Sequence, residues 1–142
     1  MILTNLSLLC GTPLKKPDNP KERNLVKGAL RRVFSRSELR RRAVEKALVK
    51  DYVDPSRPRV TKWGRCADCG KMEALYKMQV DHKDPVVPLD KALEDLSWDD
   101  VVDRLWTDER NLQALCQECH KTKSKEENKE RRLHKKIKKD ET

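Results

Sequence analysis

Between positions 21 and 50 the apolar residues recur every three or four positions, which is the spacing of amphipathic helices. The pattern predicts one helix from about Lys21 and a second over residues 38–50. Ser35 and Glu38 stand three positions apart, as in a capping box that begins a helix. The apolar positions that define the two helices are Leu25, Val26, Leu30, Val33, Phe34, Leu39, Val44 and Leu48.

Further along, the pattern changes to alternation and then returns to helical spacing. Residues 76–80 alternate apolar and polar side chains, which predicts a short strand. Ser97 and Asp100 form a second capping-box pair and predict a short helix with one apolar face. Trp98 and Trp106 are assigned to the core, and the alternative is that they stack on bases. The apolar face of this helix comprises Val101, Val102, Leu105 and Trp106.

The length of 142 residues fits one domain with extensions. Residues 1–20 contain three prolines and are expected to be irregular. Residues 21–60 are expected to form a basic helical extension, and residues 61–128 the core that carries the candidate site. A basic helix should start near Cys119 and end in a tail over residues 129–142. These elements predict the α+β fold class.

The net charge of +9 is unevenly distributed along the chain. Residues 1–65 hold seventeen Lys and Arg against six Asp and Glu, and residues 120–142 hold ten against five. Residues 66–119 hold six against thirteen. Basic arms around an acidic centre favour contact with a nucleic acid, and the alternative is that the charged helices are simply solvated. The side chains expected to contact phosphate are Arg31, Arg32, Arg40, Arg41 and Arg42.

Four of the five cysteines form two Cys-x-x-Cys pairs, Cys66–Cys69 and Cys116–Cys119. Four thiolates in two such turns suit a closed, tetrahedral, structural zinc site, and the alternative is a set of reduced thiols without metal. Hydrophobic residues make up only 36% of the chain, so a bound metal would compensate for a thin core. The pairs indicate a reducing compartment rather than a disulfide framework, and Cys10 has no expected role.

Targeting and membrane signals are weak. The first ten residues are apolar but lack a basic start and a small-residue cleavage site, so no signal peptide is expected. No apolar run approaches the length that spans a membrane. The sequence therefore predicts a soluble intracellular protein without a membrane partner.

Three further side chains with ligand or acid–base chemistry lie between or beside the cysteine pairs: Asp81, His82 and His120. They would be redundant for a zinc ion already held by four thiolates. This surplus favours an enzyme over a plain zinc module. Adjacent residues of a strand point to opposite sides, so Asp81 and His82 can do different jobs.

Three short motifs stand out in the second half of the chain: Asp81-His82, Asn111-Leu112 and Cys119-His120-Lys-Thr-Lys123-Ser124. Together they resemble the His-Asn-His (HNH) endonuclease family over roughly residues 64–128, and the zinc-bearing subgroup carries its cysteine pairs in these places. The basic stretch at residues 25–32 is similar to small bacteriophage HNH proteins. The resemblance implies a zinc-stabilised ββα-metal (His-Me finger) core with flanking basic helices, and makes residues 61–128 the nuclease domain.

The resemblance also implies a role for each motif residue. Asp81 and His120 would hold a catalytic divalent ion, and His82 would be the general base, since a histidine pKa near neutrality suits that task. Asn111 would hold the loop that bears His82 through a side-chain hydrogen bond. The position of a further family ligand is Ser124, a poor metal ligand, so Mg²⁺ or Mn²⁺ is expected rather than zinc.

The predicted function is metal-dependent DNA endonuclease activity that leaves a 5′-phosphate and a 3′-hydroxyl, in the host cytoplasm if the chain is phage-encoded. Lys123 would contact the scissile phosphate or be a solvated helix lysine, and His134 is expected to have no partner and no role. One alternative is a non-catalytic, zinc-dependent nucleic-acid-binding module. Another is an assembly partner within a phage packaging machine, which is compatible with nuclease activity.

Overall fold

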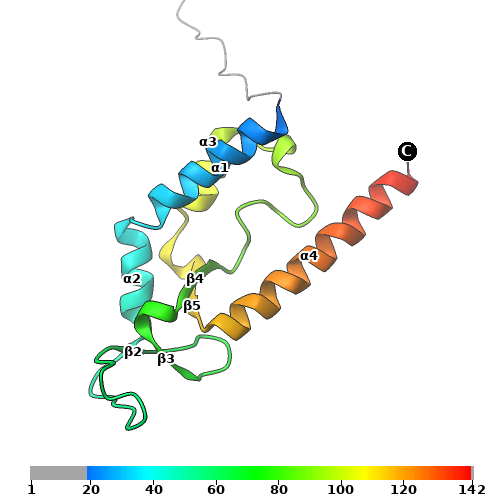
Figure 1. Cartoon of the computed structure of the whole chain (residues 1–142). Coiled ribbons are helices and arrows are strands. Elements are labelled where there is room, and N and C mark those ends of the chain that lie inside the picture. The colour runs from blue at the N-terminus through cyan, green and yellow to red at the C-terminus, as the bar shows by residue number, and fades with distance from the viewer. Residues whose placement is uncertain (1–18, 142) are drawn as a thin grey trace, which may run out of the picture.

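The computed structural model describes residues 19–141, and their fold is α+β, as predicted (Figure 1). Cys10 and nearly all of the irregular segment predicted over residues 1–20 lie outside the described residues. The helices are α1 (Pro20–Phe34), α2 (Glu38–Ala47), α3 (Trp98–Leu105) and α4 (Gln117–Asp140). The strands are β1 (Leu48–Val49), β2 (Trp63–Arg65), β3 (Met72–Ala74), β4 (Gln79–His82) and β5 (Leu112–Leu115). The short 3-10 turns are η1 (Leu75–Lys77), η2 (Leu93–Asp95) and η3 (Glu109–Asn111).

Helix beginnings follow from side chains that cap them. The predicted capping box of Ser97 and Asp100 is confirmed at the start of α3. The box predicted for Ser35 and Glu38 is wrong, because Ser35 ends α1 and the hydroxyl of Ser37 accepts the first bond of α2, at 3.2 Å. Serine at the position directly before the first helical residue satisfies an otherwise unpaired N–H group.

The second helix is shorter than predicted. It ends at Ala47, and Leu48–Val49 turn into β1, which pairs antiparallel with β2. Two residues are too few to show a strand periodicity, so the helical pattern extends through them in the sequence. β2 also pairs with β3, which completes a three-stranded sheet in the order β1-β2-β3.

The second sheet is an antiparallel pair of β4 and β5, with Gln79 opposite Leu115 and His82 opposite Leu112. The predicted strand into Asp81–His82 is present, but it starts at Gln79. Tyr76 belongs instead to η1 and is 74% exposed. The helix α4 follows β5 after a single residue, so the β4–β5 pair lies at the start of α4, although residues 83–111 separate the two strands in the chain (Figure 1).

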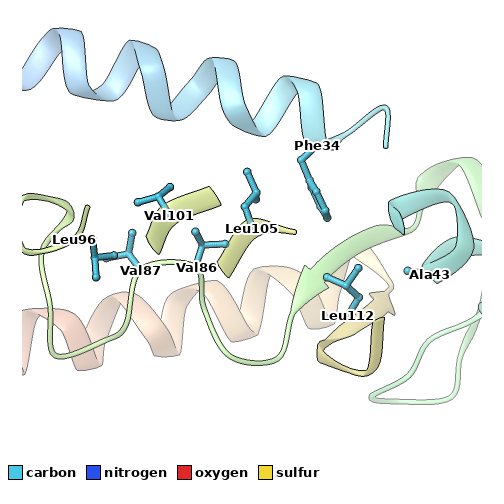
Figure 2. Close-up of a cluster of buried hydrophobic side chains, with 8 residues drawn as sticks. All are labelled: Phe34, Ala43, Val86, Val87, Leu96, Val101, Leu105 and Leu112. Carbon is cyan, nitrogen blue, oxygen red and sulfur yellow. The ribbon is translucent and has the colours of Figure 1, made fainter. Parts of the chain in front are cut away.

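The main hydrophobic core joins elements that are far apart in the sequence (Figure 2). Trp98 and Trp106 pack against it while partly buried, in agreement with their assignment to the core. Val80 of β4 packs against the same cluster, which brings the candidate site to the edge of the core. The buried members are Phe34, Ala43, Val86, Val87, Leu96, Val101, Leu105 and Leu112.

The C-terminal helix α4 is tied to the segment that follows β4. Arg131 donates to the carbonyl oxygens of Val87 and Pro88 at 2.7 and 3.0 Å. On the other side of this segment, Arg23 of α1 pairs with Glu94 at 2.9 Å. The chain after β4 therefore runs between α1 and α4 (Figure 1). Across residues 19–141 no helix is long and apolar enough to cross a membrane.

Candidate functional site

The two cysteine pairs come together at the start of α4. The sulfur atoms of all four cysteines lie within 4.8 Å of one another, so the group could hold a metal ion such as zinc. The sulfurs of Cys69 and Cys116 are 3.8 Å apart. A tetrahedral zinc ion with zinc–sulfur bonds of about 2.3 Å places its sulfurs at this separation, about 3.8 Å. The donor set and its spacing thus fit a closed zinc site, as predicted from the sequence.

The local backbone explains why the four thiols meet. Gly70 turns the chain after the first pair with a φ of +71°, a conformation that glycine adopts without strain. The N–H of Ala67 donates to the carbonyl of Ala114 at 3.0 Å, which fastens the first pair to β5. Cys116 is the N-cap of α4, so the second pair occupies the first turn of that helix. The turn, β5 and the helix start therefore build the cluster together.

Hydrogen bonds to sulfur prepare the cluster for thiolates. The N–H of Cys116 donates to the sulfur of Cys66 at 3.3 Å, and the N–H of Cys119 donates to the sulfur of Cys116 at 3.5 Å. Burial acts to raise the pKa of Cys66, but backbone N–H groups, first that of Cys116, outweigh it and lower this pKa to about 7. Burial raises the pKa of Cys116. Cys66 is therefore the readiest of these two thiols to lose its proton.

His82 is a buried histidine with one ring nitrogen already engaged. Its Nε2 lies 2.9 Å from the carbonyl oxygen of Leu105, and its ring centroid is 5.2 Å from that of Phe34. A carbonyl oxygen only accepts hydrogen bonds, so Nε2 must carry the proton in this contact. In the neutral ring Nδ1 then keeps its lone pair. This nitrogen is therefore a hydrogen-bond acceptor.

Asp81 engages α4 on the other side of the same strand. Its Oδ2 lies 2.8 Å from the Nζ of Lys123 and 3.4 Å from the Nε2 of Gln113. Lys123 also donates to the carbonyl of His82 at 2.9 Å and pairs with Glu127. Burial acts to lower the pKa of Lys123, but the bonds to its two carboxylate partners raise it. Lys123 is therefore a bound cation beside Asp81 and not a solvated helix lysine.

Asn111 holds the chain directly after His82. Its side-chain oxygen accepts from the N–H of Asp84 at 2.8 Å, and its backbone oxygen accepts from the N–H of Lys83 at 2.7 Å. Its side-chain nitrogen lies 3.4 Å from the hydroxyl oxygen of Thr107. The resemblance described above implies a side-chain bond from Asn111 to this loop. It constrains the turn that follows β4 and with it the end of the strand that carries His82.

A pocket of about 300 Å³ gathers the remaining candidate residues. Asp81, His82 and His120 all line it. The first two belong to β4 and His120 belongs to α4, so the fold brings together residues that are almost forty positions apart. His120 is in the first turn of α4, where its N–H donates to the carbonyl of Cys116 at 3.0 Å. The cysteine cluster and the pocket therefore share the same helix start. Asn111 supports this site from outside the pocket.

The pocket also contains residues that no sequence motif points to. Phe34 and Ser35 line it from the end of α1, and Gln79 lines it from the start of β4. The presence of Phe34 and Ser35 depends on how α1 packs against α3, and only the folded chain reveals it. The contact of Lys123 with Asp81 is another feature the sequence does not disclose, because 42 positions separate the two residues.

The five arginines expected to contact phosphate fall into different environments. Arg31 and Arg40 line the pocket. Arg41 pairs with Glu38 and with Glu45, and Arg42 pairs with Glu38 at 3.3 Å. Arg32 is exposed on α1. Arg31 and Arg40 are therefore the members best placed to meet a ligand of the pocket, while the charges of Arg41 and Arg42 are partly neutralised within α2.

His134 has a partner, contrary to expectation, because its Nε2 lies 3.6 Å from a carboxylate oxygen of Glu130 one turn earlier. Among residues 19–141, the cysteine cluster is the one group of three or more Cys, His, Asp or Glu found with metal-binding spacing. A second ion at Asp81 and His120 would therefore need oxygen ligands from water or from a bound molecule.

Comparisons of the chain with protein-family models, with curated proteins and with solved structures find no match.

Proposed function

We propose that this protein is a metal-dependent DNA endonuclease of the HNH class. The observation that carries the proposal is the pocket in which Asp81, His82 and His120 meet beside two arginines. A carboxylate and an imidazole can hold a divalent ion, and a second imidazole with a free nitrogen can serve as base. Arginines at the rim suit a phosphate backbone, since guanidinium groups bind phosphate oxygens in pairs.

The order of elements around this pocket supports the proposal. β4 pairs antiparallel with β5, and β5 leads into α4 after one residue, while η2, α3 and η3 lie between the two strands in the chain. A strand pair followed by a helix is also the order of a ββα-metal core. β4 carries the Asp-His pair at its end, and α4 carries His120 in its first turn. We assign α1, α2 and the distal part of α4 as the basic helices that flank this core.

In the proposed reaction His82 provides the base. A water molecule in the pocket gives a proton to Nδ1 of His82 while its oxygen forms a bond to phosphorus. The bond from phosphorus to the 3′ oxygen breaks, that oxygen gains a proton from solvent, and a 5′-phosphate and a 3′-hydroxyl result. The carbonyl of Leu105 fixes the ring through Nε2 and would stabilise the imidazolium that forms.

Asp81 and His120 are the residues proposed to hold the catalytic ion, which would neutralise charge on the phosphate and assist the leaving oxygen. The fit of Asp81 to a cation is supported by Lys123, whose ammonium lies 2.8 Å from this carboxylate. One carboxylate and one imidazole leave most of the coordination shell to water and phosphate oxygens. That arrangement suits Mg²⁺ or Mn²⁺.

Zinc on the four cysteines is proposed to have a structural role. Cys116 and Cys119 precede His120 by four positions and by one position, so an ion there would fix the helix start that presents this histidine. Cysteines that bind a metal must not be joined in disulfides, and this suits a reducing compartment such as the cytoplasm.

A non-catalytic, zinc-dependent nucleic-acid-binding module is the second candidate, favoured by the cysteine cluster and the basic arms. A binding module of this kind does not require a buried histidine in a pocket with Asp81 and His120. The nuclease proposal accounts for these residues as well.

Incubation with supercoiled plasmid separates the two candidates. The endonuclease proposal predicts nicked or linear plasmid with Mg²⁺ or Mn²⁺ and intact plasmid when the ion is omitted. Retardation of the plasmid on a gel without any cleavage, under every metal condition, would favour the binding module.

A further inference from the structure

A second pocket, of about 660 Å³, lies next to the candidate catalytic pocket. Arg40 lines both, so the two cavities are neighbours that share this residue. The volume lies within the range of about 300–1,000 Å³ that is usual for small-molecule sites. A ligand that follows the surface from one pocket to the other would pass Arg40.

The second pocket combines an apolar lining with an exposed aromatic ring. Val44, Leu75 and Met78 contribute apolar side chains to it, and Met78 is only 2% exposed. Tyr76 also lines the pocket and is 74% exposed. The ammonium of Lys77 lies 5.9 Å from the centroid of this ring. A large ring left open to solvent above an apolar lining can accept another flat ring.

The charge around this ring has one sign. Arg40, Arg59 and Lys62 line the pocket, and its lining contains no Asp or Glu. Within the described residues, none of these three side chains forms an ion pair with a carboxylate. Cations that lack carboxylate partners complement the phosphates of a nucleic acid. The pocket therefore offers both a stacking surface and phosphate ligands.

We propose that this pocket binds an unpaired nucleobase of the DNA substrate, stacked on Tyr76, with the adjoining phosphate on Arg40. This inference rests on the proposed endonuclease function and adds a substrate class to it: DNA with an unpaired base beside the phosphate that is cut. Stacking on an aromatic side chain requires a base that is free of its partner, because a paired base has its faces covered in the duplex. Continuity with the catalytic pocket through Arg40 favours DNA over an acidic peptide.

The test is a double-mutant cycle in which the tyrosine and the DNA base are removed separately and together. The affinity of the full chain for a fluorescently labelled single-stranded oligonucleotide is measured by anisotropy, without added Mg²⁺ or Mn²⁺ so that the DNA stays intact. Tyr76→Ala should weaken binding about 5- to 150-fold, whereas Tyr76→Phe, which keeps the ring, should bind like the wild type. Leu133→Ala is the matched control, because Leu133 is 58% exposed on α4, away from the pocket.

Oligonucleotides that lack one base at successive positions complete the cycle. At the position that stacks, removal of the base should weaken binding by the wild type by the same factor, and should weaken binding by Tyr76→Ala no further. The salt dependence of binding should be equal for wild type and Tyr76→Ala, because the tyrosine ring neutralises no phosphate.

The outcomes separate this inference from the proposed function. If the wild type cuts plasmid and binds the oligonucleotide, but Tyr76→Ala binds equally well, only the base site is overturned, and the pocket then suits an acidic peptide. If the wild type neither cuts plasmid nor binds DNA, the endonuclease proposal itself fails.

Discussion

At the scale of single residues, close packing at Gly64 explains how β2 sits against its neighbours. A Cβ atom at this position would lie 2.2 Å from the sulfur of Met78 and 2.8 Å from Cδ1 of Leu75. Both distances are far below van der Waals contact. Trp63, next to it, is 1% exposed, so the surroundings have little room to adjust.

A pair of glycine substitutions tests this packing. Gly64→Ala should lower the free energy of unfolding by about 1–3 kcal/mol, the usual cost of overpacking. Gly28→Ala is the matched control: it lies inside α1, where, among residues 19–141, its Cβ would meet only Nη1 of Arg32 at 3.6 Å. That change should raise stability by about 0.5–1 kcal/mol, because alanine loses less backbone entropy in a helix. Chemical unfolding of both variants gives the two values, and equal effects would contradict the packing described.

Lys123 shows a second residue-scale effect, because its ammonium lies 2.8 Å from Oδ2 of Asp81. Lys123→Met should remove this cation and leave the half-buried carboxylate without it. Added Mn²⁺ should then raise the melting temperature of Lys123→Met more than that of the wild type, since the ion no longer competes with the ammonium. Lys121→Met, at an exposed position of the same helix, is the control and should respond like the wild type. An equal shift in all three proteins would argue against an ion site at Asp81.

At the scale of elements, the sequence predicts the helices better than the strands. Apolar spacing locates α1, α2 and α3, and the capping pair at Ser97 and Asp100 marks the start of α3. β1 has two residues and exists through pairing with β2, so no local pattern announces it. Tyr76 shows the same limit, because alternation alone does not reveal that a 3-10 turn precedes β4.

The sequence also predicts some parts of the candidate site better than others. The cysteine pairs and the Asp-His dipeptide are recognisable from spacing, and the sequence brings them forward as candidates. The partners of those residues are not recognisable. The carbonyl of Leu105 lies 23 positions after His82, and Arg40 reaches the pocket from a separate helix. Such contacts depend on tertiary packing and have no signature in a single sequence.

The start of α4 is the element on which the cysteine cluster depends. Cys116→Ser should abolish zinc binding and lower the melting temperature strongly, because metal binding at a structural site is coupled to folding. Elemental analysis should find one zinc per chain in the wild type and none in this variant. Cys10→Ser is the control and should retain one zinc. Folded, metal-replete wild-type protein without zinc would refute a structural zinc site.

At the scale of the whole molecule, basic helices lie on either side of the acidic segment in the sequence, and the fold brings two of their arginines to the pocket. Charge count alone treats the five arginines predicted to contact phosphate alike. The ion pairs of Arg41 and Arg42 with Glu38 distinguish them from Arg31 and Arg40. Phosphate binding is therefore expected to depend more on Arg31 and Arg40 than on the paired arginines.

Salt dependence of DNA binding measures this difference. Replacing Arg31 and Arg40 together with alanine should reduce the slope of log affinity against log salt by about 0.9 for each phosphate that is no longer neutralised. The same replacement of Arg41 and Arg42 should reduce the slope less, since part of their charge is already paired with Glu38. A slope that neither double variant changes would indicate that these helices are only solvated.

The central claim is that His82 is the base of a nuclease, and the rate of DNA cleavage by His82→Ala tests it most directly. The variant lacks the hydrogen bond to Leu105, so the rate is measured well below its melting temperature, with DNA affinity and zinc content determined on the same samples. Cleavage should fall by about 10²–10⁴-fold, the usual contribution of a general base, while zinc and DNA binding remain. Higher Mn²⁺ should partly restore cleavage by Asp81→Ala but not by His82→Ala. His134→Ala, the matched histidine control on α4, should cut like the wild type. Cleavage by His82→Ala at the wild-type rate, under the same metal conditions, would contradict a catalytic role for this histidine.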